Sequence, residues 1–402
     1  MLKPNDVVIV SYARTPFDKF GGDMRDIPSI DLGIEVLKAV TEKVGMPKDQ
    51  VEEVLYGGCM HQEIGLYQNI PARQATLRAG FPPETVSLTI DRACCSSMMA
   101  VQMAYKDIKN GDASIAIAMG SENMSNIPYL VSGARWGKRI GHLTMDDQLF
   151  APGYRGWSPV ALDAGNVAAE YNVSREEQDQ WAYQSQQRYA QAKAEGKFKD
   201  EIVPIQVKAS KGPKVIDEDT SPRPEVTLES LAKLRTVYES PTVTAGNAPG
   251  LSAGASAILL MSAAKAQEMG IKPLAVIHGA ASVADVDKNI PVVPAKVIQK
   301  ILAQTGTSLD DIDLIEINEA FAAVPLVATK ILADGDAQKL ARLRSITNVN
   351  GGAVAIGHPV GATGARLVMT LVAELKRRGG GKGIAGICGG LAQGDGVLVE
   401  VL

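Results

Sequence analysis

Two distant stretches of this 402-residue chain follow the same order of local signals, and this weak repeat limits the possible folds most strongly. The stretches are residues 86–123 and 350–396. Each reads as a reactive residue, a turn of small residues, a helix, a Gly-rich turn and an apolar strand with a Gly-rich end. The repeat therefore predicts two similar βα halves that face each other in a predominantly α/β fold.

Apolar periodicity predicts further elements around the repeat. We expect strands at Val7–Ser11, Val51–Tyr56, Ser114–Met119, Ala275–His278, Leu314–Ile317 and Gly383–Cys388. We expect helices at Ser29–Val44, Ile70–Ala79, Cys94–Lys109, Ser174–Glu195 and Gly361–Arg377. The long polar helix should start with a capping box, because Glu177 stands three residues after Ser174.

Residues 122–248 differ in amino-acid composition from the rest of the chain. They hold all three tryptophans and much of the charge. A structureless loop of this length is improbable in a compact domain, so this region should form an inserted loop domain that walls a site. The predicted organisation is a first half, 1–121 plus 249–272, the insertion, 122–248, and a second half, 273–402.

Composition excludes several classes of protein. Lys plus Arg number 41 and Asp plus Glu 45, so no strong basic field marks a nucleic-acid binder. A hydrophobic content of 46% against 21% charged residues excludes a disordered chain. No secretory signal or membrane span is expected. The four cysteines form neither a zinc spacing nor a disulfide framework, which favours a reducing, cytoplasmic location without a metal.

Cys94 is the first candidate for chemistry. It follows a predicted strand at the start of a predicted helix, where free N–H groups favour a thiolate and could hold an oxyanion. A buried, inert cysteine is the alternative, since most free cysteines only pack. This local argument does not separate Cys94 from its neighbour Cys95.

His358 is one of four histidines and lies in the Gly-rich turn AIGHPVGATG. It suits a base that activates a thiol, although a surface turn histidine is the alternative. The spacing of glycines 357, 361 and 364 also resembles a dinucleotide-binding loop, which would indicate an oxidoreductase. This signal is weak, because the GxGxxG pattern is absent here and His-Pro interrupts the turn.

Two further candidates end predicted strands. Cys388 precedes Gly389-Gly390, and Asn318 with Glu319 follows Leu314–Ile317, where α/β folds build ligand sites. Core packing or a helix cap would explain each of them alone. The combination of Cys94, His358 and Cys388 favours a common site, because reactive residues from remote segments all occupy turn positions.

Sequence blocks along nearly the whole chain resemble the thiolases, which cleave or form 3-oxoacyl-CoA thioesters. The blocks, in family order, are ARTPFDKFGG, QNIPARQA, DRACCSSMMA, GSENMS, SREEQD, TAGNAPGLSAGASA, INEAFAA, NGGAVAIGHPVGATGAR and ICGGLAQGDG. The resemblance implies a thiolase fold of αβαβα layers with an inserted loop domain.

The resemblance also implies roles for single residues. Cys94 matches the acyl-accepting nucleophile, His358 the base that takes its proton, and Cys388 the acid/base for the α-carbon of the acetyl unit. Asn318 matches the residue that holds a water in a first oxyanion hole. The N–H groups of Cys94 and Gly390 would form a second one. The implied coenzyme A contacts are Arg223, Tyr238, Ala245, Pro249, Ala320 and Phe321.

The chain departs from the family pattern in the acyl pocket. A His-Met pair found in many thiolases is matched by Pro159 and Val160, Pro249 replaces a frequent Ser, and Tyr238 replaces a Phe. These changes favour an acyl group bulkier than acetoacetyl, such as a branched or aromatic one. Benzoylsuccinyl-CoA, from anaerobic aromatic degradation, is one candidate.

The resulting hypothesis is a thiolase with coenzyme A as co-substrate and no permanently bound cofactor. The family further implies a homodimer or homotetramer, and a small zinc-ribbon/OB-fold accessory subunit is neither required nor excluded by the sequence. The alternative from another class is an inactive acyl-CoA carrier of the same fold, which the complete set of Cys94, His358, Cys388 and Asn318 argues against.

Overall fold

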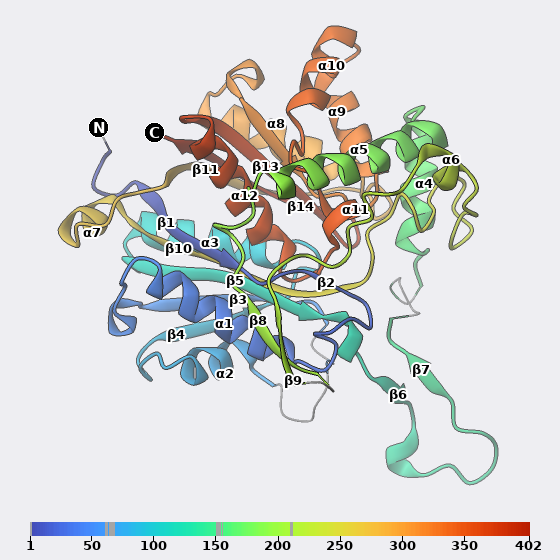
Figure 1. Cartoon of the computed structure of the whole chain (residues 1–402), viewed down its shortest axis with the longest axis horizontal. Coiled ribbons are helices and arrows are strands. Elements are labelled where there is room, and N and C mark those ends of the chain that lie inside the picture. Colours follow the sequence, from blue (N-terminus) through green and yellow to red (C-terminus); the bar gives the residue numbers. More distant parts are fainter. Residues whose placement is uncertain (1, 61–62, 64–68, 150–153, 155, 210–211) are drawn as a thin grey trace.

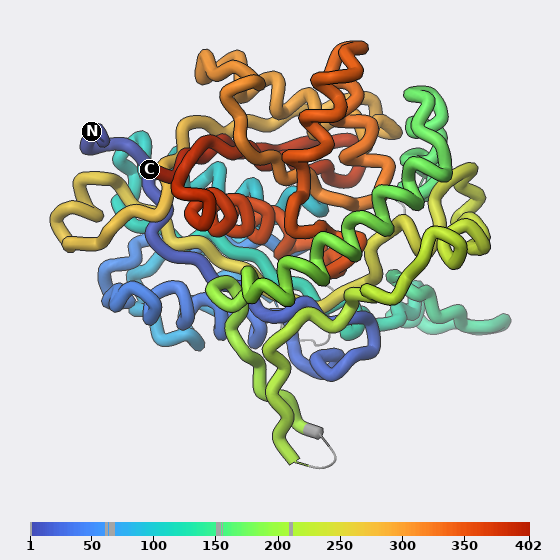
Figure 2. Tube along the Cα trace, turned by 45° about the horizontal axis from the view of Figure 1, so that its top comes forward, coloured from blue at the N-terminus to red at the C-terminus, as the bar shows by residue number. Residues whose placement is uncertain are grey.

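A computed structural model describes residues 2–60, 63, 69–149, 154, 156–209 and 212–402 (Figures 1 and 2). Its strands are β1 (Val7–Arg14), β2 (Asp18–Lys19), β3 (Glu53–Gly57), β4 (Val86–Ile90), β5 (Ile115–Asn123), β6 (Tyr129–Val131), β7 (Met145–Asp147), β8 (Ile205–Ala209), β9 (Gly212–Ile216), β10 (Ser252–Ser262), β11 (Ala275–Ala284), β12 (Leu314–Ile317), β13 (Gly381–Gly389) and β14 (Gln393–Val401). Its α-helices are α1 (Ser29–Glu42), α2 (Pro71–Arg78), α3 (Ser96–Asn110), α4 (Val160–Glu170), α5 (Arg175–Ala194), α6 (Leu228–Ala232), α7 (Ala263–Glu268), α8 (Val293–Thr305), α9 (Ala323–Ala333), α10 (Ala337–Ile346), α11 (Ala353–Ile356) and α12 (Thr363–Arg377).

The central sheet consists of two matching halves joined edge to edge. Its strand order is β12-β13-β14-β11-β1-β10-β5-β3-β4, and β1 meets β11 through the short antiparallel pairing of residues 7–9 with 275–277. Each half contains a parallel pair, β3 with β5 and β12 with β13, followed by two antiparallel strands. The two similar halves predicted from the repeat are therefore confirmed.

Helices α3 and α12 form the middle layer between the two halves of the sheet (Figure 1). They pack on each other, and each contacts strands of both halves. Helix α1 covers the outer face of β5 and β10, and α8 covers the outer face of β11, β13 and β14. This gives the αβαβα order that the resemblance implied. The residue limits of the three predicted units stay a prediction.

Strands β10 and β14 were not anticipated from the sequence. Both are buried along nearly their whole length, so small and apolar residues follow one another without the alternation that marks a half-buried strand. Two helices begin two residues after their predicted starts at Cys94 and Gly361: α3 starts at Ser96 and α12 at Thr363. As a result Cys94 lies in the loop before α3.

The described residues of the predicted insertion form two hairpins and three α-helices. The hairpins β6-β7 and β8-β9 extend away from the body (Figures 1 and 2), while α5 packs on α9 and α11 of the second half. Ser174 and Glu177 form the predicted capping box of α5. No helix within the described ranges is long and apolar enough to cross a membrane.

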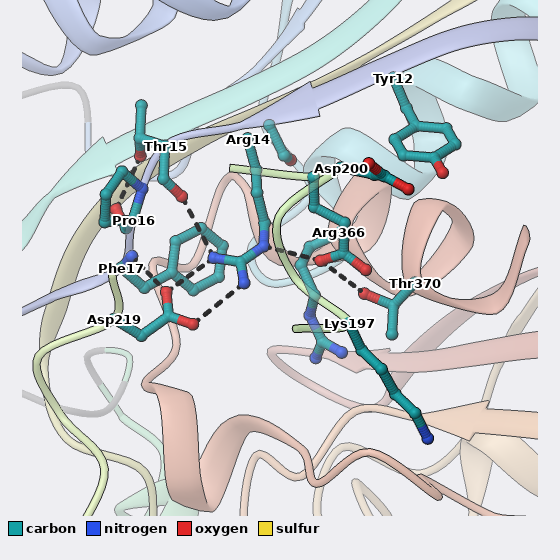
Figure 3. A network of polar contacts seen from close by, with 12 residues as sticks. Tyr12, Arg14, Thr15, Pro16, Phe17, Lys197, Asp200, Asp219, Arg366 and Thr370 are labelled. Carbon is teal, nitrogen blue, oxygen red and sulfur yellow. Dashed lines mark hydrogen bonds and ion pairs between the residues drawn. The ribbon is translucent and has the colours of Figure 1, made fainter. Parts of the chain in front are cut away.

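A buried ion cluster fastens the insertion to the first strand (Figure 3). The guanidinium of Arg14 on β1 donates to Glu201 at 2.9 Å and to both carboxylate oxygens of Asp219 at 2.7 and 3.0 Å. All three side chains are excluded from solvent. Tyr189 on α5 also donates to Asp219, and Thr370 on α12 donates to Glu201. Arg14 thereby connects the insertion to the sheet and the middle layer.

Replacing Arg14 should strongly destabilise the chain. Arg14→Met leaves two buried carboxylates without their cation, and breaking a buried pair in this way costs roughly 3–5 kcal/mol. Urea unfolding of both proteins measures this difference. The control is Lys38→Met, whose exposed pair with Glu35 should contribute less than about 1 kcal/mol. A loss at Arg14 as small as that at Lys38 would contradict the prediction.

Candidate active site

Cys94 occupies the tight loop between β4 and α3. The preceding Ala93 has a φ of +49°, and Ser96 Oγ donates to the Ala93 carbonyl at 2.7 Å, which closes the turn. Cys94 is half-buried, whereas Cys95 is buried with its thiol 3.6 Å from the Ile387 carbonyl. The structure thus separates the two cysteines, and Cys94 is the more exposed residue of the two.

The Cys94 thiol does not become a thiolate by itself, contrary to our expectation for a helix start. Burial raises the pKa of Cys94 to about 12, its own backbone N–H lowers the pKa by less, and the Glu122 carboxylate raises it further. Desolvation therefore outweighs the helix terminus. Cys94 needs a base within reach to act as a nucleophile.

His358 lies in the turn between α11 and α12, and its ring is buried. Burial lowers the pKa of His358 to about 3, and the Arg366 cation adds to this effect, so the ring is neutral near pH 7. Thr363 Oγ1 donates to the Pro359 carbonyl and must therefore accept from Nδ1, at 2.6 Å. The lone pair of the ring is thus on Nε2, where a base could take a proton.

Asn318 faces this lone pair. Its Nδ2 lies 3.4 Å from His358 Nε2, and its own N–H donates to the Gly386 carbonyl of β13. The side chain is fully buried, and its Oδ1 has no hydrogen-bond partner among the described residues. A buried orphan oxygen beside a base is where a bound water or a substrate group is expected.

Cys388 is the second-last residue of β13, close to the Cys94 loop. The next residue, Gly389, has no space for a side chain, because a Cβ there would stand 3.0 Å from Cys95 Sγ and 3.1 Å from the Arg92 carbonyl. Burial raises the pKa of Cys388, and negative charge on Cys94 raises it further. Cys388 is therefore a protonated thiol within electrostatic range of Cys94.

Glycines bring the two halves of the site into contact. A Cβ on Gly364 of α12 would collide with the backbone of Met98 in α3, and a Cβ on Gly120 would collide with the Gly361 carbonyl. Ala365 N–H also donates to Ser97 Oγ at 3.0 Å. The starts of α3 and α12 therefore meet, and the Cys94 loop and the His358 turn precede these two helix starts. Asn318 lies beside His358, and Cys388 lies within electrostatic range of Cys94.

The predicted coenzyme A and acyl contacts lie around this centre at partly open positions. Arg223, Tyr238 and Ala245 are exposed, while Pro249, Ala320, Phe321, Pro159 and Val160 are half-buried. Pro159 is the N-cap of α4, and the first residue of that helix, Val160, belongs with Phe321 to one apolar cluster. The insertion and the α9 start thus share an apolar surface.

Glu319 is not a ligand group, although its strand-end position suggested one. Its carboxylate accepts from Trp181 Nε1, Ser185 Oγ, Asn348 Nδ2 and the N–H of Val354, at 2.8–3.0 Å. These four bonds use its acceptor capacity and attach α5 to the end of β12. Glu319 holds the insertion beside Asn318.

Sequence reasoning missed three residues at the site. Tyr154 places its hydroxyl where a Cβ on Gly390 would stand, and burial together with charge on Cys94 raises its pKa. Thr363 sets the His358 tautomer, and Glu122 binds the backbone near both halves of the site. Glu122 and Thr363 lie in the quoted blocks GSENMS and GHPVGATGAR, whereas no sequence signal marked Tyr154.

Comparison with known proteins identifies the family of this chain. Residues 7–264 match the family model "Thiolase, N-terminal domain", and residues 271–401 match "Thiolase, C-terminal domain". The chain belongs to the thiolase family. It is an acyltransferase that uses coenzyme A as co-substrate, as the sequence resemblance implied.

Curated relatives and solved structures match this thiolase over its whole length. An acetyl-CoA acetyltransferase of Chromobacterium violaceum is 42% identical, over 98% of this chain and 99% of the relative. One from Syntrophomonas wolfei is 41% identical over 99% of both. The human mitochondrial 3-ketoacyl-CoA thiolase aligns at 36% identity and a TM-score of 0.93, with 100% of both chains covered. A structure of that human enzyme in complex with CoA has the same TM-score at 35% identity.

The neutral state of His358 should make folding sensitive to acid. In the unfolded chain the ring binds a proton near its ordinary pKa, whereas in the folded chain it stays neutral down to about pH 3. The unfolded state thus binds more protons, so stability falls as the pH drops from about 7 to about 4.5. His358→Asn should lose less unfolding free energy over this range than the wild type, as measured by urea unfolding.

The exposed His142 provides the control position for this measurement. His142→Asn should follow the wild-type pH dependence, because its ring is not desolvated by folding. Parallel curves for His358→Asn and the wild type would show that the ring of His358 protonates equally in both states.

Proposed function

We propose that this thiolase cleaves a 3-oxoacyl-CoA with coenzyme A, or condenses in reverse, through an acyl group on Cys94. The observation that carries the proposal is the combination of a protonated thiol on the half-buried Cys94, a buried neutral imidazole and a second protonated thiol. Neither thiol is charged at rest, so each needs a partner to exchange its proton. His358 supplies the base and Cys388 the acid.

In the cleavage direction the protons balance as follows. His358 Nε2 takes the Cys94 proton while Sγ attacks the 3-oxo carbon, and the resulting alkoxide collapses to an acyl thioester and an acetyl-CoA enolate. Cys388 protonates the enolate carbon and becomes a thiolate. That thiolate takes the proton of the incoming coenzyme A, whose sulfur attacks the thioester. His358 returns its proton to Cys94 as the acyl-CoA leaves.

Two oxyanion sites support these steps in the proposal. Asn318 would hold a water beside His358, which suits its buried Oδ1, an atom without a partner in the part of the chain that the structure describes. The N–H groups of Cys94 and Gly390 would bind the second oxyanion. Preorganised donors of this kind lower a barrier by about 3–4 kcal/mol each.

For the substrate, we propose an acyl group larger than acetyl. The support is the replacement of the family His-Met pair by Pro159 and Val160, which removes an imidazole and a thioether from the pocket. Branched and aromatic groups, including that of benzoylsuccinyl-CoA, are the candidates. The names of the relatives from Chromobacterium and Syntrophomonas favour acetyl transfer as the second candidate.

A thiolysis series combined with intact-mass spectrometry tests both parts. Each 3-oxoacyl-CoA with an acetyl, medium-chain, branched or aryl acyl group is mixed with the enzyme, without coenzyme A to detect the adduct and with coenzyme A to measure kcat/KM. We expect an acyl adduct that Cys94→Ala abolishes, and the highest kcat/KM with a bulky ester. Acetoacetyl-CoA as by far the best substrate would overturn the bulky-substrate proposal, while an adduct that persists in Cys94→Ala would overturn the assignment of the nucleophile.

We also propose a homodimer or homotetramer. Strand β4 forms an open edge of the sheet, and two of its apolar side chains, Val86 and Leu88, are exposed by 63% and 42%. An exposed apolar edge strand is a ready surface for pairing with another chain. The apolar side chains of Trp136 and Ile140, near the tip of the β6-β7 hairpin, are exposed by 90% and 92%.

Light scattering on the wild type should therefore give at least twice the mass of one chain. Val86→Lys combined with Leu88→Lys places charge on the β4 edge and should lower the mass. Glu84→Lys, at the loop before β4, is the charge-matched control and should keep the wild-type mass. A monomeric wild type would refute the proposal.

A further inference from the structure

The side chain of Glu122, near the end of β5, binds two segments that flank the site. Its Oε2 accepts from the N–H of Cys59 at 3.0 Å and from the N–H of Gly361 at 3.1 Å. Its Oε1 accepts from the N–H of Met60 at 3.0 Å. The residue is 98% buried, so these bonds form away from bulk water and their geometry is tightly defined.

One of the two segments controls the position of His358. Gly361 follows His358 by three residues in the same turn, and Ala362 is the N-cap of α12. Gly361 itself is wedged in place, since a Cβ on it would stand 2.8 Å from Gly58 Cα and 2.9 Å from the Ser121 carbonyl. The turn that carries the base therefore rests on the ends of β3 and β5.

The other segment supports the start of α3, directly after the nucleophile. Cys59 and Met60 continue from β3, whose last residue, Gly57, packs against the backbone of Ser96 and Ser97. Ser96 in turn donates to the Ala93 carbonyl in the Cys94 loop. One carboxylate thus connects the support of the nucleophile with the turn of the base.

The charge of Glu122 also acts on the nucleophile. Burial raises the pKa of Glu122 to about 7, its three backbone donors lower it, and the nearby Asp91 raises it. The Glu122 carboxylate in turn raises the pKa of Cys94, which keeps the thiol protonated until a base acts. Because the thiol stays protonated, acylation depends on proton transfer from Cys94 Sγ to His358 Nε2. A larger distance between these two atoms would therefore slow the acylation of Cys94.

We infer that Glu122 is a positioning residue, which fixes the His358 turn relative to Cys94 so that the imidazole can take the thiol proton. The inference rests on the proposed function, because it assigns Glu122 to the acylation of Cys94. Glu122→Gln keeps the size of the side chain but offers only one acceptor oxygen to three donors. The turn and the loop then lose part of their common anchor.

The experiment compares Glu122→Gln with Glu201→Gln. Glu201 is an equally buried carboxylate that binds Arg14 and Thr370, so this control removes a buried charge without touching the two segments. Both variants should have a lower Tm. Rapid-quench mass spectrometry with a 3-oxoacyl-CoA that acylates the wild type gives the rate of Cys94 acylation, and steady-state kinetics give kcat and KM.

We expect Glu122→Gln to acylate about 10- to 100-fold more slowly, because small misplacements of reacting groups cost rates of this order. Its KM should change by less than about threefold, since substrate binding is not affected. Glu201→Gln should keep the wild-type acylation rate. Glu122→Asp, which keeps the charge but is one methylene too short to span both segments, should also slow acylation and serves if Glu122→Gln does not fold.

The outcomes distinguish the inference from the proposed function. If the wild type acylates on Cys94 and the Glu122 variants acylate at the wild-type rate, Glu122 is only a structural residue and the inference is wrong. The inference is also wrong if Glu201→Gln slows acylation as much as Glu122→Gln. If the wild type itself forms no adduct on Cys94, the proposed function fails first.

Discussion

The close contact between the starts of α3 and α12 is the constraint on which the rest of the structure depends. Two helices with side chains at every position stay 8–10 Å apart, whereas Gly364 lets the backbone of α12 touch that of Met98. Gly120 allows the same approach between β5 and the turn of the base. The Gly-rich composition of the chain is thus a requirement of the site, because side chains there would separate the base from the nucleophile.

Burial then decides the protonation states that this contact brings together. Desolvation keeps the thiols of Cys94 and Cys388 protonated and the ring of His358 neutral. A Cys94 thiolate would be a stronger nucleophile than the thiol, but its charge would be desolvated in the free enzyme, and an imidazolium at His358 could not take a proton. Because the two thiols and the imidazole are neutral in the free enzyme, charge develops on them only during the reaction, when substrate and hydrogen-bond donors are present to stabilise it.

The repeat was a sound basis for the fold, because two matching halves of the sheet are present. Turn positions singled out Cys94, His358, Cys388 and Asn318, and the structure places Asn318 beside His358 and Cys388 within electrostatic range of Cys94, while their roles stay a prediction. Strands β10 and β14 were missed because full burial removes the alternation that marks a strand. Tyr154 was missed because its contact with Gly390 joins segments more than two hundred residues apart, and no local pattern reports such a contact.

The insertion is held by charges that a sequence pattern alone presents as ordinary surface residues. Arg14, Glu201, Asp219 and Glu319 are all fully or nearly fully buried, and together they attach α5 to β1, α12 and the end of β12. Each of these anchors lies beside an element that carries a site residue, since Glu319 follows Asn318 and α12 follows His358. The insertion can therefore vary its exposed hairpins and its pocket residues while the reacting groups stay in place, because its attachment and its contact surface use different side chains.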